Sequence, residues 1–349
     1  MPRALHLRPN QRMEHKGSGD PIPIVFQNLM QEAEKGKREK RILLYDNRME
    51  TIAKTVLSAS RRTDIPAFYM EWFMAGIDRG LFEVTNPYNG VVRQVDCTPE
   101  AVHTIVFWSK NFAPFLDGRF GETLAGAGYH LFFNFTVNSE DRLLEPNLPS
   151  LDQRLCQLAE LTRRFGPERV QWRFDPICFY TAGNGGFKNN LADFPKIAKA
   201  AAEAGIGQCV TSFLDLYAKV QKRVATAGAT FMAPGLEKQV EVVSRMAGLL
   251  KGCGIALHTC CEKELMAALP VDVPVTASAC IDGRLFMEND GGTVPVQKDR
   301  GQRAGAGCGC TRSVDIGSYA DHPCYHSCLF CYANPAARPG GRGGPPRAS

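Results

Sequence analysis

The sequence predicts an α/β protein built as a full or partial (β/α) barrel. Short runs of β-branched, aromatic and other apolar residues recur along the chain, and segments with helical patterning lie between most of them. Strands that alternate with helices favour a parallel sheet, and seven or eight such units are typical of a closed or partly closed barrel. The length of 349 residues allows one large domain of this kind.

Each expected strand is a short apolar run of the kind that is buried inside a protein. In chain order, the expected strands span residues 55–60, 81–86, 104–110, 130–137, 169–174, 208–213 and 255–260. The expected helices occupy the intervals between them, and several end at a glycine that suits a helix C-cap. The clearest of these helices span residues 66–80, 151–166, 190–205 and 235–254.

We expect one barrel domain over residues 53–334. A variable, partly disordered extension at 1–52 precedes it, and a disordered tail rich in proline and glycine follows at 335–349. The charged stretch 29–41 inside the extension predicts a short surface helix.

Composition favours a soluble, cytoplasmic protein with reduced thiols. The 13 cysteines are an odd number, and the first ten residues lack the apolar core of a secretory signal. No apolar stretch reaches the roughly 18 residues that a membrane span needs, so no membrane contact is expected. The formal charge of +5 is mild and gathers in residues 34–41 and in the arginines of the tail. Solvated ends are the favoured interpretation, and nucleic-acid binding is the alternative.

Polar side chains follow nearly every expected strand, which is where barrels carry their catalytic and binding groups. Arg173 and Asp175 lie two residues apart, so both should face a polar interior opposite Trp172 and Phe174. A buried ion pair is the alternative to ligand binding for these two. The sequence identifies no catalytic residue, but it does give candidate cofactor-binding residues: Arg61 (with Arg62 as its competitor), Asp64, Asn134, Arg173, Asp175 and Ser212.

The strongest chemical signal is the run HPCYHSCLFCYANP, in which Cys324, Cys328 and Cys331 follow the pattern CxxxCxxC. Three cysteines are one short of filling a four-iron cube, so they leave one iron open to an exogenous ligand. A zinc site completed by His322 and His326 is the alternative. The iron–sulfur cluster is favoured because aromatic and small residues surround the last cysteine as a dry pocket would.

The segment CYHSCLFCY resembles the cluster-binding signature of the radical S-adenosylmethionine enzymes, whose fold is a full or partial (β/α) barrel. The resemblance implies that Cys324, Cys328 and Cys331 ligate a [4Fe-4S] cluster and that S-adenosylmethionine chelates the fourth iron. It also implies that a reductant such as flavodoxin or ferredoxin supplies one electron, which cleaves the sulfonium and releases a 5′-deoxyadenosyl radical.

In that superfamily the motif usually follows the first barrel strand, whereas here it comes almost last. A circular permutation would reconcile these facts, with residues 313–319 serving as the strand before the cluster loop. The segments SRRTDIP, FWSKN, WRFDPI and CGC, followed by the cysteine motif, also resemble one bacterial family, domain of unknown function 1848, over residues 57–334. The expected fold is therefore a barrel of the radical S-adenosylmethionine type, permuted so that the cluster loop is C-terminal. The tail cannot form the helix that normally follows such a loop.

Four further cysteines, Cys260, Cys280, Cys308 and Cys310, are expected to converge at the same barrel mouth. A second, fully thiolate-ligated [4Fe-4S] cluster fits them, with Cys261 as a competing ligand. A four-cysteine zinc site and buried free thiols are the alternatives.

The expected function is an enzyme that cleaves S-adenosylmethionine reductively and starts radical chemistry on an unidentified small-molecule or macromolecular substrate. The first alternative is an iron–sulfur electron-transfer or zinc-structural module without this chemistry. WRFDPI also resembles a stretch in the branch of the superfamily that contains the spore photoproduct lyase. A DNA-repair enzyme that acts on nucleic acid is therefore the second alternative.

Overall fold

The structure is a computed structural model that describes residues 53–86, 89–183 and 185–333. The expected N-terminal extension with its helix at 29–41, the last residue of the expected domain and the expected tail lie outside these residues. No helix among the described residues is both long and apolar enough to cross a membrane.

Eight strands form one large sheet, and every neighbouring pair in it is parallel. The order across the sheet is β12-β11-β9-β6-β5-β4-β1-β13, so seven strands follow chain order and the last strand lies beside the first. The eight strands are β1 (Thr55–Ala59), β4 (Val102–Ser109), β5 (His130–Thr136), β6 (Val170–Ile177), β9 (Gln208–Phe213), β11 (Ala256–Thr259), β12 (Val275–Ala277) and β13 (Val314–Asp315).

The predicted α/β class is confirmed, and the arrangement is compatible with a partial (β/α) barrel. Within the described part of the chain, no pairing joins β12 to β13, so the sheet is open and a full barrel is not seen.

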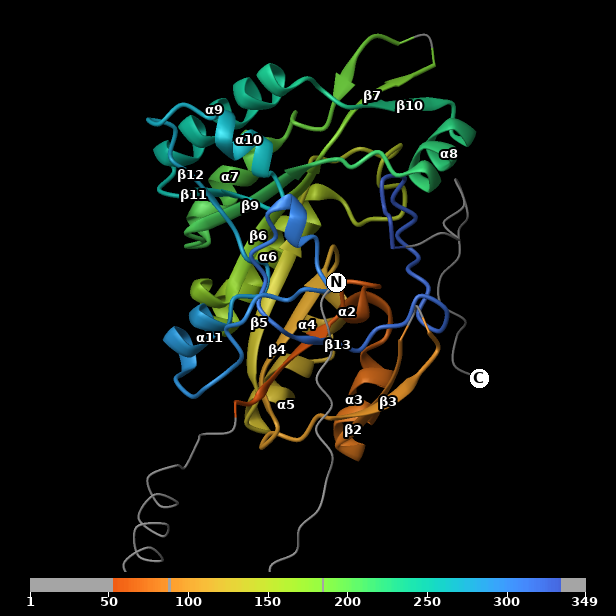
Figure 1. Ribbon diagram of the computed structural model, residues 1–349, viewed down its shortest axis with the longest axis vertical. Helices are drawn as coiled ribbons and strands as arrows, with labels where there is room; N and C mark the ends of the chain where they lie inside the picture. The colour runs from red at the N-terminus through yellow and green to blue at the C-terminus, as the bar shows by residue number, and fades with distance from the viewer. Residues whose placement is uncertain (1–52, 87–88, 184, 334–349) are drawn as a thin grey trace, which may run out of the picture. The chain divides into compact units, whose positions relative to one another are not determined.

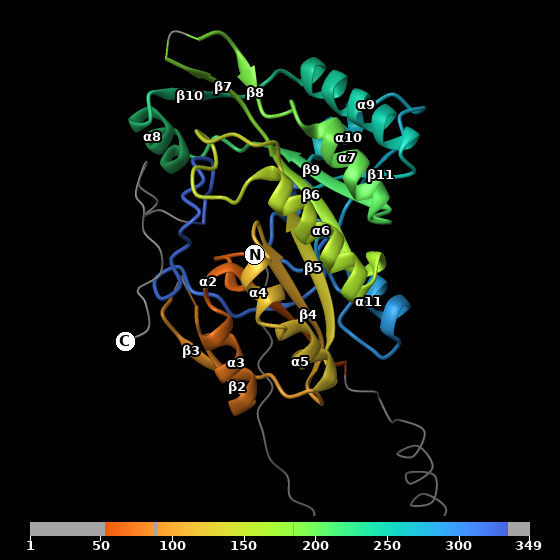
Figure 2. The same ribbon diagram turned by 180° about the vertical axis from the view of Figure 1, so that it is seen from behind.

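One face of the sheet packs against helices. Figure 2 shows α6, α7 and α9 in front of the sheet, and Figure 1 shows the blue C-terminal segment crossing the other face. Alternate residues of the strands, including Phe107, Phe133 and Trp172, are buried in the core that these helices cover. The helices are α2 (Ile65–Phe68), α3 (Met70–Arg79), α4 (Ala113–Asp117), α5 (Phe120–Gly126), α6 (Leu151–Phe165), α7 (Phe194–Glu203), α8 (Ala218–Thr226), α9 (Leu236–Gly252), α10 (Lys263–Ala268) and α11 (Gly283–Asp290).

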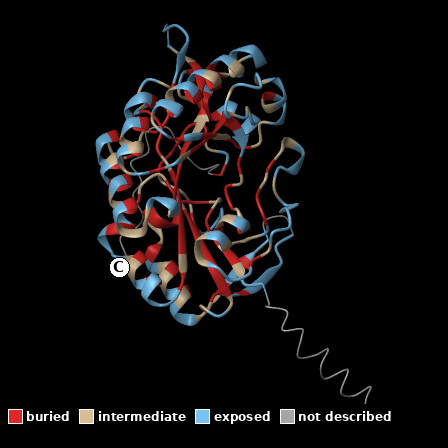
Figure 3. Cartoon of the chain, turned by 90° about the vertical axis from the view of Figure 1, so that its left-hand side faces the viewer, coloured by how far each residue is buried: buried red, intermediate tan, exposed pale blue. Residues whose placement is uncertain are grey.

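Helix α6 shows why these segments are helical and how they attach. Ser150 and Gln153 form a capping box that satisfies backbone N–H groups at its start. Leu158 and Leu161 lie on its inner face and are fully buried, whereas Asp152 and Glu160 are not; Arg154 is a charged residue that is buried with the leucines. Figure 3 shows the same division in the outer helices, which are buried toward the sheet and exposed on the other side.

The prediction that residues 81–86 form a strand of the main sheet is wrong. β2 (Leu81–Thr85) pairs antiparallel with β3 (Val92–Asp96) in a separate two-stranded sheet. Phe82 and Val84 are buried while Glu83 and Thr85 are exposed, and this one-sided burial is typical of an antiparallel strand at the surface.

Two other features were not expected. A three-stranded antiparallel sheet contains β7 (Phe179–Ala182), β8 (Lys188–Asn189) and β10 (Ala229–Met232). The segment expected to be one helix at 66–80 is divided into α2 and α3 at Tyr69.

Polar contacts, rather than a long ladder, hold β13 beside β1. The Asp315 carboxylate accepts hydrogen bonds from Ser58 Oγ at 3.0 Å, Ser60 Oγ at 2.6 Å and the Arg61 backbone N–H at 2.8 Å. Gly317 follows so closely that a Cβ there would lie 2.1 Å from Ser60 Oγ, so the position requires glycine. The expected strand at 313–319 is therefore present, although only two of its residues pair.

Candidate functional site

A cavity of about 280 Å³ lies at the carboxyl ends of the main strands, where parallel α/β sheets bind their ligands. Its walls come from the ends of β1, β4, β5, β6, β9, β11 and β12, or the segments after them, and from two stretches of the C-terminal segment. Of the residues predicted from the sequence, all but Asn134 line it: Arg61, Asp64, Arg173, Asp175, Ser212, Cys260, Cys280, Cys308, Cys310, Cys324, Cys328 and Cys331. Asn134 lies behind the wall, where its amide donates a hydrogen bond to the Cys280 carbonyl at 3.1 Å.

Cys324, Cys328 and Cys331, here called the motif cysteines, lie on one loop at one end of the cavity. The buried Arg223 of α8 holds this loop by donating hydrogen bonds to the carbonyls of Leu329 at 3.1 Å and Cys331 at 2.6 Å. Leu329 and Phe330 of this loop are buried, and Phe330 also lines the cavity.

Within the described residues, no three His, Cys, Asp or Glu side chains are arranged to hold a metal ion as they stand. The motif cysteines border an open volume instead of converging on one point. Burial raises the pKa of the Cys328 thiol, and the charge of Glu145 raises it further.

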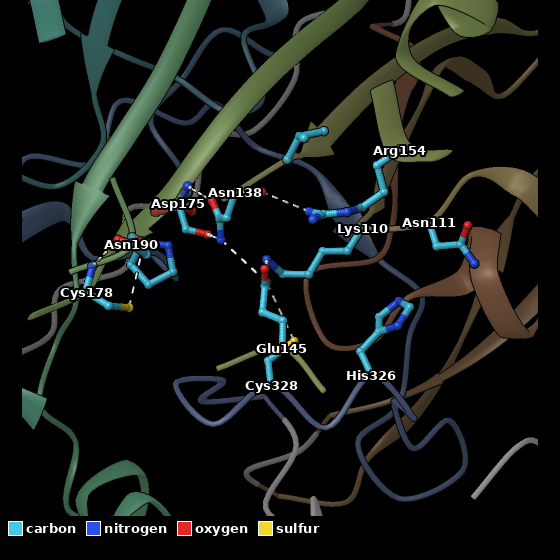
Figure 4. A network of polar contacts seen from close by, with 12 residues as sticks. Lys110, Asn111, Asn138, Glu145, Arg154, Asp175, Cys178, Asn190, His326 and Cys328 are labelled. Carbon is cyan, nitrogen blue, oxygen red and sulfur yellow. Dashed lines mark hydrogen bonds and ion pairs between the residues drawn. The ribbon is translucent and has the colours of Figure 1, made fainter. Parts of the chain in front are cut away.

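A polar network that the sequence did not reveal lies against Cys328 (Figure 4). Lys110 Nζ donates to Glu145 Oε1 at 2.6 Å, and this carboxylate oxygen is 3.9 Å from Cys328 Sγ. Burial alone would lower the pKa of Lys110, but the charge of Glu145, the charges of Cys328 and Asp175, and the hydrogen bond to Glu145 together outweigh it, so the pKa is raised. Lys110 therefore stays a cation beside the motif cysteines. Glu145 lies in a loop after β5, and nothing in its local sequence distinguishes it from a surface glutamate.

Asp64 joins the segment after β1 to the motif loop. Its Oδ1 accepts the Ala67 N–H at 3.0 Å and so caps α2, while its Oδ2 accepts the Lys110 N–H at 2.9 Å. The same Oδ2 contacts His326 Nε2 at 2.8 Å. Asp64 lines the cavity, but its oxygens already have these partners.

The two histidines of the zinc alternative are not brought together at the motif cysteines. His326 lines the cavity and contacts Asp64, whereas His322 is not among the residues that line it. The His322 ring lies 4.1 Å from the Trp72 ring between centroids, and its Nδ1 accepts the Ser318 N–H at 3.1 Å. This arrangement does not favour a zinc site that uses both histidines.

Arg173 and Asp175 face the cavity while Trp172 and Phe174 face the helices, as their alternation predicts. Arg173 Nη2 donates to Asp175 Oδ2 at 2.5 Å, and Ser212 Oγ donates to Asp175 Oδ1. Arg173 and Asp175 therefore form a buried ion pair and also line the cavity. The sequence had left these two roles as alternatives.

The guanidinium groups of two arginines lie over the indole ring of Trp108. Arg61 lies 5.2 Å and Arg173 5.5 Å from the ring centroid, within the range of cation–π contacts. Arg62 instead donates to the Gly317 carbonyl at 2.9 Å. Both arginines line the cavity, but Arg61 is the one on which the charges of Cys310 and Cys280 act, whereas Arg62 holds the backbone at Gly317.

Cys260, Cys261, Cys280, Cys308 and Cys310, here called the upstream cysteines, also line the cavity. The Sγ atoms of Cys260 and Cys261 are 3.6 Å apart, and those of Cys280 and Cys260 are 3.5 Å apart. Contact with Cys261 raises the pKa of Cys260 to about 12. Hydrogen bonds from Cys280 and Cys308, together with the charge of Arg61, lower the pKa of Cys310. The convergence of these cysteines on one site was predicted, including the competing position of Cys261.

These features define an α/β protein with an open parallel sheet and a cysteine-lined cavity at the carboxyl ends of its strands. The chain belongs to the family described as domain of unknown function (DUF1848), whose model matches residues 56–333. The family assignment made from the sequence is thereby confirmed, and it carries no assigned activity.

No curated protein matches the chain. Among solved structures, a sugar phosphate isomerase/epimerase from Parabacteroides distasonis ATCC 8503 is similar with a TM-score of 0.32 and 12% identity, over 71% of this chain and 96% of that one. A D-hydantoinase from Bacillus sp. AR9 has a TM-score of 0.27 and 14% identity, over 50% of this chain and only 38% of that one. A 7,8-dihydropteroate synthase from Vibrio fischeri ES114 has a TM-score of 0.22 and 15% identity, over 51% of this chain and 65% of that one.

Proposed function

We propose that this protein is a cytoplasmic radical S-adenosylmethionine enzyme whose motif cysteines hold a [4Fe-4S] cluster. The observation that carries the proposal is the shared cavity, because Cys324, Cys328 and Cys331 line it together with polar residues from the ends of five strands. Three thiols facing an open volume suit a cluster with one iron left for an exogenous ligand, whereas a structural zinc site needs four ligands around one ion.

The position of β13 supports the permutation that this proposal needs. The strand directly before the motif loop lies beside β1 at the edge of the sheet. A first strand moved to the end of the chain would occupy this place.

The chain's own residues fit the cluster by shielding and positioning it. Leu329 and Phe330 keep water from one side of the motif loop, and Arg223 fixes the carbonyls of that loop. Lys110 places a positive charge next to Cys328, which partly opposes the rise in the Cys328 pKa that burial and Glu145 cause.

The other polar residues of the cavity would bind S-adenosylmethionine and the substrate. Ser212, Asp175 and Arg173 form one connected group, and Arg61 lies across Trp108 from it. The cluster, once reduced by a donor such as flavodoxin or ferredoxin, supplies the electron for reductive cleavage of S-adenosylmethionine. We propose an organic substrate of still undefined class, small or macromolecular. The basic segments behind the nucleic-acid alternative lie outside the described residues.

The direct test is anaerobic reconstitution with iron and sulfide, followed by dithionite and S-adenosylmethionine. We expect 5′-deoxyadenosine from the wild-type protein and none from Cys328→Ala. Cys156→Ala is the matched control, because Cys156 is exposed on α6 away from the cavity. A protein that carries a loaded cluster but forms no 5′-deoxyadenosine would support electron transfer, and a colourless protein with one zinc would support a structural metal site.

A further inference from the structure

We propose that Cys260, Cys280, Cys308 and Cys310 hold a second [4Fe-4S] cluster, that Cys261 is not a ligand, and that Arg61 and Arg173 balance the charge of this cluster. The inference concerns different cysteines from the proposed function and stands without it.

The first argument is the gathering of thiols from three separate segments. Cys260 and Cys261 follow β11, Cys280 follows β12, and Cys308 and Cys310 lie in the segment after α11. Their side chains border an open volume, unlike the core thiol of Cys209, which is fully buried in the core beneath the helices. Free cysteines that serve only as small apolar residues have no reason to converge on a cavity.

The second argument is the two cations that face these thiols. Arg173 Nη1 donates to Cys280 Sγ at 2.7 Å. Arg61 Nη2 is buried and has no hydrogen-bond partner among the described residues, although Cys310 is the neighbour whose charge acts on it most strongly. Arg173 already pairs with Asp175, and Arg61 Nη1 donates to Ser313 Oγ at 3.3 Å, so Arg61 Nη2 is the group without a partner in the described part of the chain. A four-iron cluster with four thiolates carries net negative charge, which would give this group a partner in a site where unpaired charge is costly.

The third argument selects four ligands from five thiols. Cys260, Cys280, Cys308 and Cys310 are each at most 7% exposed, whereas Cys261 is only partly buried. Cys308 and Cys310 are separated by Gly309, where a Cβ would lie 2.9 Å from the Ser278 carbonyl oxygen. Glycine at this position lets the CGC segment press against the backbone that carries Cys280.

A single zinc ion is the alternative for these four cysteines. The Sγ atoms of Cys260 and Cys280 are 3.5 Å apart, close to the separation of about 3.8 Å that tetrahedral zinc–thiolate bonds require. A structural zinc site, however, is closed by its four ligands, and here the thiols share an open cavity with the motif cysteines. The open volume favours the larger cluster.

The test begins with a variant that lacks the three motif cysteines. In the variant Cys324→Ala/Cys328→Ala/Cys331→Ala, reconstituted anaerobically, we expect about four irons and four sulfides per chain and the brown colour of a [4Fe-4S] cluster. Adding Cys310→Ala should abolish this iron, while adding Cys261→Ala should leave it unchanged. Circular dichroism confirms that each variant is folded, and Cys308→Ala replaces Cys310→Ala if the latter does not fold.

A second measurement tests whether Arg61 balances the charge of the proposed cluster. Arg61→Met in the same triple variant should keep the iron but shift the reduction potential of the cluster to a more negative value, because a nearby positive charge is lost. The proposal is overturned if the triple variant binds one zinc ion in place of iron. It is also overturned if the triple variant binds no iron while the wild type binds about four irons per chain. Equal loss of iron when Cys261→Ala or Cys310→Ala is added would overturn it as well. Because none of these measurements uses S-adenosylmethionine, failure of the proposed enzyme activity remains distinguishable.

Discussion

His326 and Asp64 are 262 positions apart in the chain, yet His326 Nε2 lies 2.8 Å from Asp64 Oδ2, and both side chains are almost fully buried. The contact fastens the motif loop to the segment after β1. We expect His326→Phe to destabilise the metal-free protein by about 1–3 kcal/mol, because a buried carboxylate oxygen loses a donor. Urea unfolding of the metal-free protein measures the change. His326→Gln, which retains an N–H donor, is the control and should cost less; equal losses would contradict a role for the hydrogen bond.

Lys110 and Glu145 form an ion pair whose side chains are 17% and 3% exposed. Removing either charge leaves the other buried without its partner, so Glu145→Leu should destabilise the protein by about 3 kcal/mol. The double variant Lys110→Met/Glu145→Leu should be less destabilised than the sum of the single variants. A double-mutant cycle from urea unfolding measures this coupling, and additive effects would show that the pair contributes no interaction of its own.

Arg223 donates hydrogen bonds to backbone carbonyls of the motif loop. Arg223→Met should therefore leave the cysteines proposed as ligands in place but loosen the loop, and the proposed cluster should lose iron to a chelator several-fold faster than in the wild type. Lys222→Met is the matched control, because Lys222 is the exposed neighbour on the same helix. Equal rates of iron release in the two variants would exclude a positioning role for Arg223.

His130 gives the fold a dependence on pH away from the cysteines. Burial lowers its pKa below the usual 6.5, although Asp290, 3.2 Å away, partly opposes the shift. The unfolded chain binds this proton more readily than the folded protein, so stability should fall as pH drops through 6.5 toward the folded-state pKa. His130→Asn should lose less of its thermal stability than the wild type between pH 7.5 and about pH 5. A difference in melting temperature between the two that stays constant with pH would contradict this.

The parallel strands could be predicted because burial on both sides leaves a continuous apolar signature. Residues 104–110 and 130–137 carry that signature and became β4 and β5. Residues 81–86 have alternating burial instead, and that pattern separates them from the main sheet. Sheet closure depends on contacts between distant edges, which no local pattern records, and the place of β13 depends on one aspartate, Asp315.

The candidate site likewise contains residues that the sequence could predict and residues that it could not. The cysteines could be chosen because thiols are chemically distinctive and their spacing is compact. Lys110 ends the expected strand at 104–110, so its place at the site could be predicted, but its partner Glu145 could not. Glu145 and Arg223 matter through partners far away in the chain, and neither their type nor their neighbours in sequence marks them. The binding role of Asn134 predicted from its strand position becomes, in the structure, a contact with the backbone of Cys280.

The pairing of β13 with β1 has a consequence for biosynthesis. A ribosome makes β1 first among the described strands and β13 last, so the growing chain exposes the outer edge of β1 until the sheet is almost complete. Both the edge strand and the motif cysteines then emerge within residues 314–331. A message cut short before this point would yield a sheet with an open edge and without the cysteines proposed to hold the cluster, so premature termination would remove the edge strand and the proposed cluster site together.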